Sequence, residues 1–157
     1  MATSVIDGTI EEAVLKRRRA QASVYERVVF RLDDGTTKTW VKAVVLNDVA
    51  DLVLPGTRGR FYLFTAIDHR GISGVRTVDG REASGVPKVN EKASIWVIVM
   101  MMVLNGLYVL VLDKISILAL VLMILGVPMY FFYRQVRIEA ERQFAADAGY
   151  RPAAAAA

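Results

Sequence analysis

The stretch LYVLVLDKISILALV (residues 107–121) decides how this sequence can fold. It lies inside an apolar run over residues 93–133 whose only charged residues are Asp113 and Lys114. A soluble amphipathic helix would place polar residues at every third or fourth position, and a buried strand would end within about ten residues. Neither pattern fits, so the run predicts two membrane-spanning helices joined at the charged pair.

The two predicted spans cover residues 93–112 and residues 115–133, and neither contains a charged residue. A helix of about twenty residues, rising 1.5 Å per residue, matches the roughly 30 Å hydrocarbon core of a bilayer. Two charges inside that core would cost several kcal/mol, whereas they cost little in water. Asp113 and Lys114 are therefore expected at the tip of a transmembrane hairpin.

Basic residues predict the orientation of this hairpin. Lys114 alone lies at the predicted tip. The basic residues that flank the two ends of the hairpin are Lys88, Lys92, Arg134, Arg137 and Arg142. Because basic residues favour the cytoplasmic side, both termini are expected in the cytoplasm. We therefore expect a multi-pass protein of the bacterial inner membrane, without a secretory signal peptide.

Composition narrows the classes of partner and cofactor. The chain has a formal net charge of +4, no cysteine and one histidine. A mild excess of positive charge suits proximity to anionic lipid better than nucleic acid, which is not an expected partner. Without cysteine, disulfides and thiolate metal or redox sites are excluded. His69 lies in a charged turn without further candidate ligands, so no catalytic residue, metal site or cofactor is expected.

Residues 24–90 read as a small β domain. Alternating and β-branched segments predict strands over residues 24–32, 37–46, 60–67 and 72–78, separated by glycine-containing turns. Asn47 and Asp48 are expected to cap a short helix over residues 49–54. This order predicts an OB- or SH3-type barrel on the cytoplasmic side, in an α+β membrane protein. As an architecture, it resembles the bacterial NfeD-like membrane proteins, which join helices to an OB domain, with the domain order reversed here.

The first 23 residues form a basic segment with two possible structures. Residues 4–10 could form a strand, whereas Thr9 and Glu12 form a capping box before a helix over residues 10–23. We expect the helix over residues 10–23.

Six basic residues are candidates for binding anionic lipid or another anion, because a tethered domain stays close to lipid headgroups. They are Lys16, Arg17, Arg18, Arg19, Arg58 and Arg60. The alternative for the run over residues 16–19 is a solvated surface. Phe61 and Tyr62 beside the last two arginines could instead form a stacking surface for nucleic acid, although such aromatic residues more often fill a core.

Three residues interrupt the apolar spans and are candidates for helix–helix contact. Asn105 needs a hydrogen-bond partner in lipid, either in another subunit or within the same hairpin, and Gly106 beside it allows close approach. Pro128 cannot donate a backbone hydrogen bond and is expected to kink the second span.

Residues 134–149 are expected to continue the second span as a cytoplasmic helix. Val136, Ala140 and Phe144 repeat at four-residue spacing, and Arg137 can pair with Glu141. The apolar stripe needs a partner, which is either the β domain or a neighbouring subunit. Residues 150–157 form a low-complexity tail.

These features lead to three functional hypotheses. The first is a non-enzymatic membrane protein that anchors its β domain and acts as a homo-oligomer or as an accessory subunit of a membrane complex. The second is a membrane-tethered regulator or sensor that binds anionic lipid or ligand through the basic residues. The third is an oligomeric pore.

Overall fold

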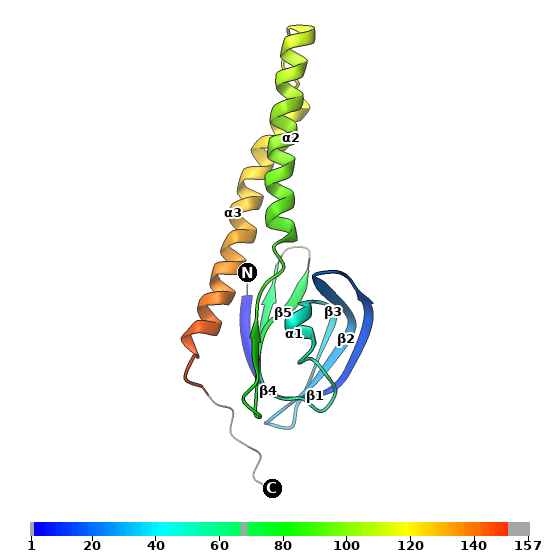
Figure 1. Cartoon of the computed structure of the whole chain (residues 1–157), viewed down its shortest axis with the longest axis vertical. Helices are drawn as coiled ribbons and strands as arrows, with labels where there is room; N and C mark the ends of the chain where they lie inside the picture. The colour runs from blue at the N-terminus through cyan, green and yellow to red at the C-terminus, as the bar shows by residue number, and fades with distance from the viewer. Residues whose placement is uncertain (1, 67–68, 151–157) are drawn as a thin grey trace. The chain divides into compact units, whose positions relative to one another are not determined.

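The computed structural model describes residues 2–66 and 69–150 of the 157-residue chain (Figure 1). The chain divides into two compact units. One unit consists of Met1–Pro87 together with Val136–Ala157, and the other is Lys88–Gln135. The first unit is therefore built from both sides of the apolar run.

Five strands of the first unit close into a β-barrel. Strand β1 pairs with both β2 and β4, β2 pairs with β3, β4 pairs with β5, and a parallel pairing of β3 with β5 completes the closure. Strand β6 adds to the free end of β5. The elements are β1 (Ala2–Arg18), β2 (Ala22–Leu32), β3 (Thr37–Leu46), α1 (Asn47–Ala50), β4 (Arg58–Thr65), β5 (Arg70–Thr77) and β6 (Glu82–Ser84). The predicted barrel-like domain with four strands and one helix is confirmed, with two additional strands.

The N-terminal segment is a strand, so the predicted helix over residues 10–23 is wrong. The first part of β1 pairs with β4, the last part pairs with β2, and Gly8 pairs with both. Ile6 and Ile10 point into the barrel and are 7% and 0% exposed. Pairing on both sides and burial of these side chains outweigh the local capping signal of Thr9 and Glu12. A side chain at Gly8 would collide with the Arg31 carbonyl, because its Cβ would lie 2.3 Å from that oxygen.

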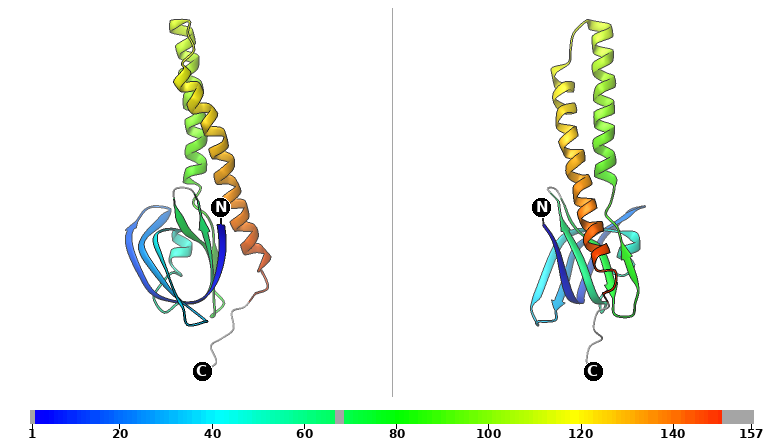
Figure 2. Two further views of the ribbon diagram at one scale, coloured as in Figure 1. Left: turned by 180° about the vertical axis from the view of Figure 1, so that it is seen from behind. Right: turned by 90° about the vertical axis from the view of Figure 1, so that its left-hand side faces the viewer.

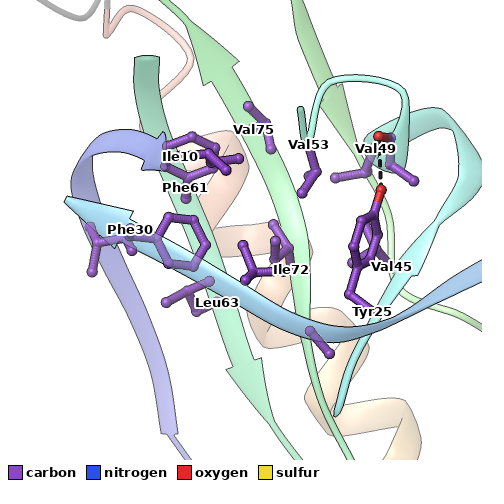
Figure 3. Packing of buried hydrophobic residues seen from close by; sticks show 14 residues of the cluster. Ile10, Tyr25, Phe30, Val45, Val49, Val53, Phe61, Leu63, Ile72 and Val75 are labelled. Carbon is purple, nitrogen blue, oxygen red and sulfur yellow. Dashed lines mark hydrogen bonds between the residues drawn. The ribbon is translucent and has the colours of Figure 1, made fainter. Parts of the chain in front are cut away.

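The barrel interior is a single apolar core (Figure 3). Phe30 and Phe61 meet at its centre with 5.1 Å between ring centroids. Helix α1 and the turn after it cover one end, and the Tyr25 hydroxyl donates a 3.2 Å hydrogen bond to the Ala50 carbonyl. Burial raises the pKa of Tyr25. The fully buried residues of this core are Ile10, Val28, Phe30, Ala43, Val45, Val49, Val53, Phe61, Leu63, Ile72 and Val75.

The predicted cap of α1 is wrong in detail. The helix begins at Asn47, earlier than expected, and no side chain caps its first turn. The Asn47 side chain instead accepts a 2.9 Å hydrogen bond from Ser23 and donates to the carbonyls of Arg19 and Ala20. Asn47 therefore holds the β1–β2 turn.

The second unit is a hairpin of two helices, α2 (Val89–Leu112) and α3 (Ile117–Ala146). Helix α3 continues past the unit boundary, so the predicted extension over residues 134–149 is part of the same helix up to Ala146. Asp113, with a φ of 52°, and Lys114 lie in the connection between the helices, as predicted. Both helices are long and apolar enough to cross a membrane.

The hairpin helices meet along a narrow seam. Along this seam the less exposed positions of α2 are Ser94, Ile98, Met101 and Asn105, and their counterparts are Ser116 in the connection and Ala119, Met123, Gly126 and Tyr130 on α3. Spacings of three and four residues are typical of helices that pack side by side. Most of the remaining apolar side chains are exposed, including Trp96 at 72% and Leu110 at 84%. An apolar surface of this extent requires lipid or other protein around it.

Candidate functional site

The outer surface of strand β4 carries the densest cluster of polar contacts in the first unit. Arg60 projects outward from β4 and forms a bidentate ion pair with Asp7 of β1, at 2.8 Å through Nε and 2.7 Å through Nη2. These hydrogen bonds raise the pKa of Arg60. The strand register explains the pair, because Asp7 and Arg60 are direct partners in the β1–β4 ladder.

Asp147, which follows the end of α3, joins this cluster from the far end of the chain. One of its carboxylate oxygens, Oδ2, accepts a 3.1 Å hydrogen bond from Arg60 and a 2.9 Å hydrogen bond from the Tyr62 hydroxyl. The Arg60 guanidinium also stacks on the Tyr150 ring at 3.3 Å from its centroid. Burial, together with the hydrogen bond to Asp147, raises the pKa of Tyr62 to about 12.

Phe144 packs across the paired strands β4 and β5. Its ring lies 5.0 Å from that of Tyr62, and the Arg76 guanidinium lies 4.2 Å from its centroid. Arg76 is 7% exposed, forms an ion pair with Glu82 and donates to the Phe144 carbonyl at 3.3 Å. A Cβ at Gly74 would lie 2.6 Å from the Phe144 ring, so glycine is required here for the close approach. We call residues 136–150 the C-terminal clasp.

The apolar stripe near the end of α3, which is part of the clasp, is buried. Val136 and Ala140 are 3% and 1% exposed within the unit that contains the barrel. Strand β4 is buried on both faces: Phe61 lies in the core, while on the other face Tyr62 packs against Phe144 of the clasp and Phe64 against His69, and both are 0% exposed. The uninterrupted run RFYLF is typical of such a strand. Neither aromatic ring of the proposed nucleic-acid stacking surface is accessible.

The six basic residues predicted to bind anions do not form one site. Arg58 and Arg60 pair with Thr9 and Asp7 in the first part of β1, whereas the run over residues 16–19 lies at its far end. Arg58 forms an ion pair with Asp33 at 3.1 Å, and Arg60 is held by two carboxylates. Arg60 therefore links the barrel to the clasp through Asp147.

The remaining four basic residues lie at the exposed end of the β1–β2 hairpin. Arg18 forms a 3.0 Å ion pair with Asp51. Lys16, Arg17 and Arg19 are exposed, and none of them has an ion pair or side-chain hydrogen bond within residues 2–66 and 69–150. These three side chains carry the unneutralised positive charge of this region.

The three residues predicted to make helix–helix contacts have different environments. The Asn105 side-chain oxygen accepts a 2.9 Å hydrogen bond from the backbone N–H of Ser116, so it has a partner within the hairpin. This hydrogen bond satisfies the backbone N–H of a residue in the non-helical connection between α2 and α3. A Cβ at Gly106 would meet nothing within 4 Å, so Gly106 does not mediate this seam. Pro128 lies inside α3.

The glycine that allows close packing of the hairpin is Gly126, which the sequence analysis missed. A Cβ there would lie 2.7 Å from the Ile98 side chain. The pattern of exposed positions on both helices identifies this residue, but a single glycine in an apolar run gives no comparable signal.

A cavity of about 610 Å³ lies between the β5–β6 turn and the end of the clasp, lined by residues 76–82 and 148–150. Its charged groups are paired, Arg76 with Glu82 and Arg81 with Asp79.

His69 packs edge-on against Phe64, at 5.6 Å between centroids. Over residues 2–66 and 69–150, no cluster of His, Asp and Glu side chains could hold a metal ion.

Comparison with known proteins gives no match to a family model, a curated protein or a solved structure.

Proposed function

We propose that this protein is a two-span protein of the bacterial inner membrane that acts without catalysis. In this proposal the hairpin of α2 and α3 crosses the bilayer, and the barrel lies in the cytoplasm as an interaction domain of a homo-oligomer or of a larger membrane complex. The exposed apolar surface of the hairpin supports insertion, because lipid removes the cost that water would impose on it.

One observation carries the topology. The segments before and after the hairpin belong to one compact unit, joined by the contacts of Asp147 with Arg60 and Tyr62. Two segments that pack together must lie on the same side of the membrane, so the chain between them must cross an even number of times. A pair of antiparallel spans meets this requirement. The basic residues at its ends support the cytoplasmic side.

We also infer that the barrel is of the OB type and not of the SH3 type. The support is its five-stranded closure, with β1 shared between β2 and β4 and the short helix α1 placed between β3 and β4. Fold type alone supplies no activity. A binding role in place of catalysis is supported by the use of Arg60, Tyr62 and Arg76 in contacts with the clasp.

Labelling of single cysteines in intact cells tests the topology. The natural chain has no cysteine, so Lys114→Cys and Asp48→Cys each create one reactive site. A membrane-impermeant thiol reagent added outside should modify Lys114→Cys directly and Asp48→Cys only after the membrane is opened. Reversed labelling, or recovery of the untreated protein in the soluble fraction, contradicts the proposal.

Mass measurement of the protein in detergent tests the second part of the proposal. A homo-oligomer or a complex with other subunits is expected, and a lone monomer in the native membrane extract contradicts it.

A further inference from the structure

We propose that the end of the β1–β2 hairpin docks on a membrane surface that carries anionic lipid. We call this surface the basic tip and define it as Val14, Leu15, Lys16, Arg17 and Arg19. The inference rests on the proposed membrane function, because tethering by the helical hairpin of α2 and α3 keeps the basic tip close to lipid headgroups. The end of this β-hairpin projects from the side of the barrel in the right-hand view of Figure 2.

The charge at the basic tip is available for a ligand. Of the four consecutive basic residues, only Arg18 has a carboxylate partner among the described residues, namely Asp51. Elsewhere in the described barrel, exposed arginines such as Arg27, Arg31 and Arg58 have acidic partners. Lys16, Arg17 and Arg19 therefore concentrate net positive charge at one end of the barrel, as a site for anionic headgroups requires.

Exposed aliphatic side chains accompany this charge. Val14 and Leu15 are 37% and 49% exposed, although they lie within a strand. The β1–β2 register is irregular between Val14 and Leu15 and again between Leu15 and Arg17. Such irregularities turn side chains away from the regular face of a strand. Leucine and valine beside lysine and arginine are typical of surfaces that lie at the lipid interface.

The turn between β1 and β2 is also held in place before any ligand binds. Asn47 donates hydrogen bonds of 3.0 and 3.1 Å to the carbonyls of Arg19 and Ala20, and the Arg19 N–H donates to the Ala22 carbonyl at 2.9 Å. Ordering the backbone in advance lowers the entropic cost of docking. The tip contains no aromatic residue, whereas single-stranded nucleic acid is usually held by stacking on such rings.

A fluorescent probe on the full-length protein tests this inference. Ala20→Cys provides a single labelling site at the turn. The labelled protein is reconstituted into nanodiscs of phosphatidylcholine alone or with phosphatidylglycerol, both containing a headgroup-level quencher lipid. We expect stronger quenching in the anionic discs, since each basic residue near such a surface favours docking roughly fivefold. Added salt should reduce the difference.

Two variants locate the effect. Lys16→Gln/Arg17→Gln/Arg19→Gln should abolish the difference between the two kinds of disc. A matched control that removes the same charge elsewhere, Arg31→Gln/Arg58→Gln/Arg81→Gln, should preserve it. Because the three tip side chains make no ion pair or side-chain hydrogen bond with the part of the chain that the structure describes, the first variant should unfold at the same temperature as the parent.

Several outcomes overturn the inference. Equal quenching in both kinds of disc, or a difference that survives in the tip variant, removes the docking site. Loss of the difference in the control variant as well attributes it to overall charge. A probe that responds to single-stranded DNA and not to phosphatidylglycerol makes the tip a nucleic-acid site. Failure of the protein to enter nanodiscs contradicts the proposed membrane function instead.

Discussion

The barrel and the hairpin use the same types of apolar residue in opposite ways. In the barrel, Phe30, Phe61 and Leu63 are fully buried, whereas in the hairpin Trp96 and Leu110 are largely exposed. A protein surrounded only by water would bury both sets. The difference indicates that apolar residues of the barrel stabilise its core, whereas most apolar residues of the hairpin contact its surroundings. Equivalent substitutions should therefore have unequal effects in the two regions.

The largest expected effect is the loss of an aromatic ring from the barrel core. Phe61→Ala should lower the free energy of unfolding by about 3–5 kcal/mol, because it leaves a cavity beside Phe30. Leu110→Ala, on the exposed surface of α2, should change it by less than about 1 kcal/mol. Denaturant titration of the full chain in detergent compares the two variants. Equal losses would break the comparison between the regions.

Alkaline titration gives the next largest effect. The pKa of Tyr62 is raised to about 12 in the folded state, above about 10 in an unfolded chain. The resulting stability is fully present below pH 10 and is lost as the pH rises through 12, because the unfolded state releases this proton first. After allowance for partial screening by solvent, the loss amounts to about 2 kcal/mol. Tyr62→Phe should unfold with a weaker dependence on pH in this range, and an unchanged dependence would show that another group causes it.

Removal of the Asp147 carboxylate should have a smaller effect. Asp147→Ala leaves the buried Tyr62 hydroxyl without its acceptor and should cost about 1–3 kcal/mol. Limited proteolysis should then cut the C-terminal clasp faster than in the parent. Asp79→Ala, which removes an exposed ion pair with Arg81, should cost less than about 1 kcal/mol and serves as the control. Unchanged protection of the clasp in Asp147→Ala would contradict the role assigned to this carboxylate.

The smallest effect separates the two glycines of the hairpin. Gly126→Ala places a methyl group 2.7 Å from Ile98 and should destabilise the helix pair by about 1 kcal/mol after the gain in helix propensity. Gly106→Ala meets nothing within 4 Å and should stabilise it slightly. Unfolding in mixed detergent micelles measures both. The same sign for both substitutions would contradict the seam described here.

The sequence predicts elements whose signal is local and fails where distant segments meet. The two long helices, the turn at Asp113 and the strands β2 to β5 follow from periodicity and turn residues. For the N-terminal segment the helix was preferred to the alternative of a strand, because the capping box of Thr9 and Glu12 is a local signal, whereas the pairing with β4 that outweighs it is not.

The candidate sites show the same limit. The basic run over residues 16–19 stands out in the sequence, and all four of its residues are exposed. The ion pairs of Arg60 could not be predicted, because its partners Asp7 and Asp147 lie far away in the sequence and only the fold brings them together. Asn105 was expected to need a hydrogen-bond partner, and its side-chain oxygen accepts one within the hairpin, from the backbone N–H of Ser116.

The discontinuous first unit has a consequence for how the protein is made. The ribosome releases residues 1–87 well before residues 136–150, so Tyr62 lacks its contacts with Phe144 and Asp147 while the hairpin is being synthesised. Completion of the barrel surface thus waits until α3 and the residues after it have been synthesised. A chain that stops short, or whose second helix is misplaced, keeps an unshielded aromatic surface that proteases and chaperones can recognise.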